Sequence, residues 1–145
     1  MKTISLIVAL LIAGFTVSYG QCDKKFTITT SKTEHLDSKG TVTRTDDNEK
    51  AIVVIGKTDL SITVNSDEGE HKMTGTIKAD TCNWPVAYKV GKKVIKAVIS
   101  NGNGEDRNVT ITITGKDGKV TLLFESENEP DDRIRVTADK FEETI

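Results

Sequence analysis

Acidic side chains and a histidine gather in one short segment, Asp67-Glu68-Gly69-Glu70-His71. Carboxylates beside an imidazole can bind a metal ion or transfer protons. The same composition is typical of a solvated hairpin tip, and nothing in the sequence orients these groups against one another. We therefore interpret the segment as a turn and predict no metal site there.

A second group of oxygen-bearing side chains lies in Asn101-Gly102-Asn103-Gly104-Glu105-Asp106. Alternating side-chain oxygens and turning glycines resemble calcium loops. A closing bidentate glutamate at EF-hand spacing is missing, because the residues that follow already alternate like a strand. Whether this loop binds calcium stays open, and we predict no metal ligand and no cofactor-binding residue in the chain.

Catalytic signatures are missing from the sequence. It contains two histidines, His35 and His71, which lie far apart. We find no Gly-x-Ser-x-Gly elbow, no phosphate-binding loop and no dinucleotide fingerprint. We predict that the protein is not an enzyme and has no catalytic residue; a small hydrolase is the remaining catalytic alternative.

Trp84 is the only tryptophan, and it lies between Cys82 and Tyr88 beside the rigid Pro85. An aromatic pair next to a loop is typical of a contact for a ligand or a protein partner. The alternative is that Trp84 packs over a disulfide as part of the core. We keep Trp84 and Tyr88 as candidate contact residues beside that alternative.

The two cysteines, Cys22 and Cys82, predict a disulfide, because an even number in an exported chain favours pairing. The bond would close a loop of 60 residues. The loop-entropy model gives such a closure about 4 kcal/mol as an upper figure. Zinc binding is disfavoured because no further ligands lie near either cysteine.

Residues 1–20 resemble a secretory signal peptide. Lys2 precedes an apolar run from Ile4 to Phe15, and the small residues Ser18 and Gly20 favour cleavage before Gln21. The run is shorter than the roughly 20 residues of a membrane-spanning helix, so a retained anchor is the weaker alternative. Lipidation of Cys22 is disfavoured because Gln21, not a small residue, precedes it. The remaining residues, 21–145, form a single predicted β domain.

Apolar and polar residues alternate in most of this domain, as in residues 26–29, 60–64, 109–114 and 134–138. This period is typical of half-buried strands. Residues 51–55 and 94–99 are more continuously apolar, so we expect them to be buried on both faces. Residues 37–40 and 115–118 have the composition of tight hairpin turns.

About ten strands joined by short links predict an all-β antiparallel meander. We prefer a closed barrel with a calycin-like topology to a sandwich, because closure removes exposed edges. In strand count and order alone this resembles the lipocalin and fatty-acid-binding families, which hold an apolar ligand inside the barrel. The interior is predicted to be apolar and to include Phe26, Ile28, Val42, Ile62, Val64, Met73, Ile77, Tyr88, Val90, Val109, Ile111, Ile113, Leu122, Phe124, Ile134 and Val136.

The charges are balanced, with 20 Lys and Arg against 22 Asp and Glu. This balance disfavours nucleic acid and anionic membrane surfaces as partners, and no second apolar run predicts a membrane span after signal cleavage. We expect a secreted or periplasmic, non-catalytic β-barrel that binds a small apolar ligand or a protein partner. An inhibitor or interaction module acting on an extracellular enzyme is the alternative.

Overall fold

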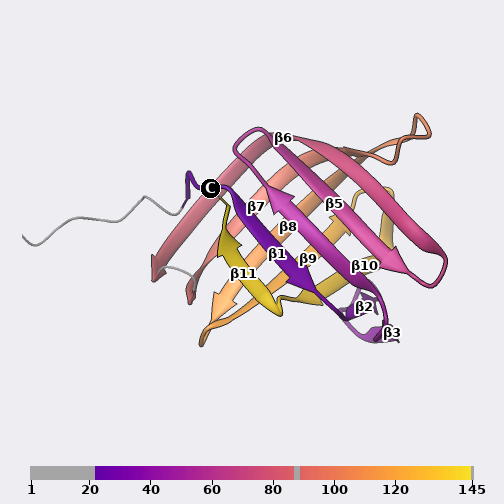
Figure 1. The fold of residues 1–145 in the computed structure, drawn as a ribbon, viewed down its shortest axis with the longest axis horizontal. Helices are drawn as coiled ribbons and strands as arrows, with labels where there is room; N and C mark the ends of the chain where they lie inside the picture. The colour runs from indigo at the N-terminus through magenta and orange to yellow at the C-terminus, as the bar shows by residue number, and fades with distance from the viewer. Residues whose placement is uncertain (1–21, 87–88, 145) are drawn as a thin grey trace, which may run out of the picture.

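The computed structural model describes residues 22–86 and 89–144, which form eleven β-strands and no helix (Figure 1). The predicted signal peptide, residues 1–20, and Gln21 lie outside these residues. Within the described part, no helix is long and apolar enough to cross a membrane. The strands are β1 (Phe26–Thr30), β2 (Thr33–Leu36), β3 (Val42–Asp46), β4 (Lys50–Ile55), β5 (Asp59–Ser66), β6 (Gly69–Val86), β7 (Val90–Ser100), β8 (Asp106–Lys116), β9 (Lys119–Ser126), β10 (Glu129–Thr137) and β11 (Lys140–Glu143).

All strands belong to one antiparallel sheet in the order β11-β1-β4-β5-β6-β7-β8-β9-β10-β2-β3. From β4 to β10 each strand pairs with its neighbour in sequence, which confirms the predicted meander. The predicted turn at residues 115–118 is also confirmed. Asp117 and Gly118 both have positive φ, 54° and 77°, as a tight hairpin of primed type requires.

The hydrogen-bonded order is open, with β11 at one edge and β3 at the other, so the predicted closed barrel is not confirmed. β1 and β2 belong to one N-terminal run that is interrupted by Ser31 and Lys32. β1 pairs with β4 at one side of the meander, whereas β2 pairs with β10 at its other side. The same run therefore contacts both sides of the meander.

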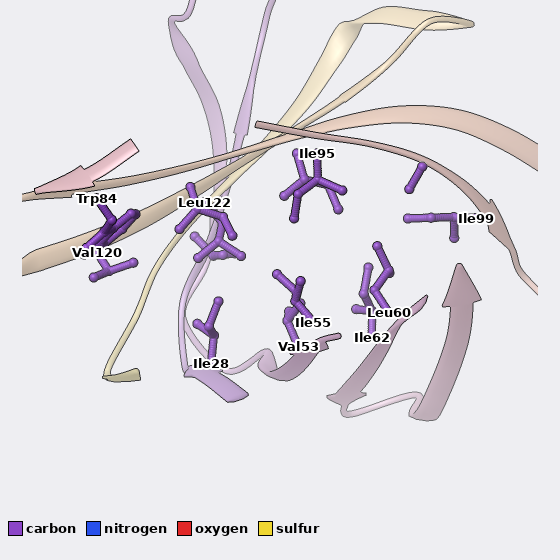
Figure 2. Packing of buried hydrophobic residues seen from close by; sticks show 14 residues of the cluster. Ile28, Val53, Ile55, Leu60, Ile62, Trp84, Ile95, Ile99, Val120 and Leu122 are labelled. Carbon is purple, nitrogen blue, oxygen red and sulfur yellow. The ribbon is translucent and has the colours of Figure 1, made fainter. Parts of the chain in front are cut away.

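The sheet bends over itself so that its apolar face is buried. Ile28, Val53 and Ile55 from β1 and β4 lie opposite Ile95 and Leu122 from β7 and β9 in one cluster (Figure 2). Successive side chains of a strand point to opposite faces, and the burial pattern of β8 alternates accordingly. Of the predicted interior, Phe26, Ile28, Ile62, Ile111, Ile113, Leu122 and Val136 are among the buried residues.

Two sequence-based expectations about burial were wrong. Residues 51–55 are buried on one face alone, since Ile52 is 41% exposed between buried Ala51 and Val53. Residues 94–99 behave in the same way, with Lys96 exposed between Ile95 and Ala97. Val42 and Val90, which were expected inside, are each 42% exposed, and each is the first residue of its strand.

The molecule has two distinct ends. The connections between β5 and β6, β7 and β8, and β9 and β10 lie together at one end, which we call the open end (right in Figure 1). The opposite end, the plugged end, carries the β8–β9 turn and the last residues of β6. The C-terminal segment lies there too, because the amide of Thr144 donates a hydrogen bond to the carbonyl of Lys25 at 2.8 Å.

Candidate functional site

An interior cavity of about 220 Å³ lies between the two layers of the bent sheet and opens at the open end. Its wall is built from apolar side chains on β4 to β10. Successive side chains of a strand point to opposite faces, so alternate residues of these strands face the cavity. These residues are Ala51, Val53, Ile62, Val64, Met73, Ile99, Val109, Phe124, Ile134 and Val136. An apolar cavity of this size is able to hold a small organic molecule; a void of about 150 Å³ holds benzene in another protein.

The mouth of the cavity is lined by charged side chains, four acidic and one basic: Glu49, Glu125, Glu129, Asp132 and Arg107. Three of the carboxylates are paired across strands. Glu129 lies 3.0 Å from Arg107, and Glu125 lies 3.3 Å from Arg133. Asp132 lies 3.1 Å from the Nδ1 atom of His35.

Glu49 differs from the other carboxylates at the mouth. It is partly buried and precedes β4, where the two-residue period that turns Ala51 and Val53 inward also turns Glu49 toward the cavity. The hydroxyl of Thr33, a 2% exposed residue of β2, donates a hydrogen bond to Glu49 Oε1 at 2.9 Å. No ion pair joins Glu49 to a basic side chain within the described residues. In the part of the chain that the structure describes, Glu49 is thus a positioned carboxylate without a cationic partner.

Ser126 also lines the cavity. It ends β9 and faces the same side as Phe124, two residues before it. Its Oγ atom is buried and has no hydrogen-bond partner within residues 22–86 and 89–144. A buried hydroxyl without a partner is unfavourable, but almost none of its surface is accessible, so it does not face the open space of the cavity.

Trp84, a candidate contact residue, is 8% exposed and belongs to the core at the plugged end. Its ring stacks on Phe141, with the ring centroids 6.0 Å apart. Gly91 and Gly115 lie against the indole, and a Cβ atom at either position would lie within 2.8 Å of it. Trp84 therefore packs as part of the core, as the alternative interpretation of the sequence expected. Tyr88 lies outside the described residues, and a partner contact through either side chain stays a prediction.

The predicted disulfide is confirmed. Cys22 and Cys82 are bonded, with their Cα atoms 5.8 Å apart, and both pack against the core cluster at the plugged end. Lys93 lies beside them and is 4% exposed. Its ammonium group donates to the carbonyl oxygen of Cys22 at 3.1 Å and lies 3.1 Å from a carboxylate oxygen of Asp80. Sequence reasoning missed this inward lysine, although its place in the alternation of β7 would have indicated it.

The two loops with chemically suggestive compositions are hairpin connections. His71 and the acidic residues before it are exposed where β5 turns into β6. In the other loop, Asn101 Oδ1 accepts a hydrogen bond from the amide of Asn103 at 3.0 Å, which is a common turn geometry. No three His, Cys, Asp or Glu side chains in the described ranges are arranged to hold a metal ion. Calcium binding by the loop stays untested.

Two arginines of β10 pair with acidic side chains of neighbouring strands. Arg133 pairs with Glu125 and Arg135 pairs with Glu34, because cross-strand neighbours lie closer than residues along a strand. Arg135 Nε donates to Glu34 Oε2 at 2.7 Å, across the β2–β10 junction. This hydrogen bond holds the pKa of the Glu34 carboxyl below its usual value of 4.5.

Sequence reasoning anticipated an apolar interior and left a ligand cavity open, but it did not indicate the acidic mouth. Glu49, Arg107 and Ser126 lie at strand ends, where composition alone indicates a solvated loop. Only the register of the strands brings these ends together. Comparison of the chain with protein-family models, with curated proteins and with solved structures gives no match.

Proposed function

We propose that this protein is a non-catalytic carrier that binds a small, largely apolar molecule in the cavity at the open end. The observation that supports this most directly is the cavity itself, about 220 Å³ with ten apolar lining residues. Protein interiors are normally filled to crystal-like density. An open apolar void between the two layers of the sheet is therefore a feature that ligand binding would use.

The burial of Trp84 favours a carrier over an inhibitor of an extracellular enzyme. An inhibitor would present a solid core and an exposed aromatic loop to its partner. Trp84 is 8% exposed and stacks on Phe141 within the core. The aromatic residue that best fitted a partner contact therefore serves packing, whereas the space needed by a carrier is present.

We propose that the carrier acts in the periplasm or outside the cell. The Cys22–Cys82 disulfide supports this, because such bonds persist in oxidising compartments. We also propose that the bent sheet works as a barrel in which the interrupted run β1–β2 joins the two sides of the meander. The β1–β4 and β2–β10 pairings support this arrangement.

Binding of a small neutral dye, whose fluorescence rises in apolar surroundings, tests the carrier proposal. We expect saturable binding that Val64→Phe weakens at least about ten-fold, since the added ring occupies the cavity and removes apolar contact. Thr63→Phe is the matched control, because Thr63 is next to Val64 and its side chain points to the outer face of β5. Absence of dye binding, or equal binding by both variants, would refute the proposal.

A further inference from the structure

We infer that the molecule bound in the cavity is a small amine, whose ammonium group rests on Glu49 and whose ring or short chain fills the apolar interior. This inference rests on the proposed carrier function and names the ligand class. It follows from the charges at the mouth and the size of the cavity.

The charge at the mouth favours a cation. Arg107, the basic residue that lines the cavity, is already paired with Glu129 at 3.0 Å and lies 4.0 Å from Glu105. A ligand carboxylate would find no unpaired cation there and would be repelled by Glu49. An ammonium group would meet a carboxylate that lacks a basic partner, and a charge-assisted hydrogen bond in a partly buried site is stronger than a neutral one.

Glu49 is also prepared for this role by its neighbour. Thr33 is buried and its hydroxyl holds Glu49 Oε1, which leaves Oε2 available to a ligand. A carboxylate that is already oriented loses less conformational freedom on binding than a mobile surface side chain does. The same geometry explains why Glu49 is partly buried although no cation in the described residues pairs with it.

The cavity limits the size of the apolar part. A volume of about 220 Å³ suits a single ring or a short alkyl chain.

Displacement of the bound dye by three molecules of nearly equal shape tests the ligand class: phenethylamine, 2-phenylethanol and 3-phenylpropanoate at neutral pH. We expect the amine to bind about ten-fold more tightly than the alcohol, and the carboxylate more weakly than both. Glu49→Gln should abolish the preference for the amine. Glu68→Gln removes a charge at the same end of the molecule outside the cavity lining and should leave the preference intact.

The outcomes separate this inference from the carrier proposal. Dye binding with equal displacement by all three molecules, or an amine preference that survives in Glu49→Gln, would overturn the amine inference and leave the carrier proposal standing. Failure of the dye to bind at all would remove both. Thermal melting would verify that each variant folds.

Discussion

The two ends of this molecule are built from the same strands and differ in how their interiors are filled. At the plugged end Trp84 and Phe26 both stack on Phe141, and the void that is left is about 10 Å³. At the open end, a few residues further along the same strands, the void is about 220 Å³. The first volume is about that of one water probe, whereas the second exceeds that of a benzene-binding cavity.

The difference indicates that one end of the sheet stabilises the fold and the other end is suited to ligand binding. The plugged end combines an aromatic stack, a disulfide and close glycine contacts, each of which stabilises the fold. The open end has apolar residues without full packing and carboxylates at its mouth, which add little stability. Regions that bind ligands are commonly the less stable part of a fold, so we expect substitutions at the two ends to separate into losses of stability and losses of binding.

Removing the indole should have the largest effect. Trp84→Ala is expected to lower the free energy of unfolding by about 3–5 kcal/mol, because it deletes a buried aromatic side chain and leaves a cavity. Chemical denaturation measures this value. A loss below 1 kcal/mol would mean that the plugged end does not carry the stability assigned to it.

A glycine next to the indole provides the matched control. A Cβ atom at Gly115 would lie 2.8 Å from Trp84 Cζ2, so Gly115→Ala should destabilise the native protein. In the Trp84→Ala background the same change should cost less, since the clashing ring is gone. A double-mutant cycle without coupling would contradict this contact.

Removing the disulfide should have the next largest effect. Replacement of both Cys22 and Cys82 by serine opens a 60-residue loop and should lower the free energy of unfolding by about 2–4 kcal/mol. Dye affinity of the folded variant should stay unchanged, because the bond lies at the plugged end. A loss of dye affinity in protein that is still folded would show that the two ends are coupled.

These predictions depend on features that the sequence revealed to different degrees. Alternation in segments such as residues 109–114 is a local signal, so strands, turns and the disulfide were predictable. The exposure of Ile52 and Val42 was not predictable. A continuous apolar run or the first residue of a strand resembles a core segment until the neighbouring strands are known. The residues around the cavity were not predictable for the same reason: Glu49 and Ser126 lie far apart in the chain, and only the register of the sheet brings them to one cavity.

The smallest expected effect concerns the junction between β2 and β10, which joins the two sides of the meander. Arg135 holds Glu34 there in a partly exposed ion pair, with side chains 40% and 23% exposed. Such pairs contribute little, so Arg135→Gln should lower the free energy of unfolding by about 1 kcal/mol or less at pH 7. Lys140→Gln, which breaks a pair within β11, is the control and should have no comparable effect.

The stabilisation by the Arg135–Glu34 pair should depend on pH. The hydrogen bond from Arg135 lowers the pKa of Glu34 in the folded protein, so the pair contributes its full stability above the unfolded pKa, near 4.5. That contribution decreases as the pH falls through the lowered folded pKa, where the carboxyl becomes protonated in both states. The stability difference between the native protein and Arg135→Gln should therefore be largest at neutral pH and shrink toward zero in stronger acid. A difference that is constant with pH would mean that Arg135 stabilises the β2–β10 junction through packing of its aliphatic stem and not through its charge.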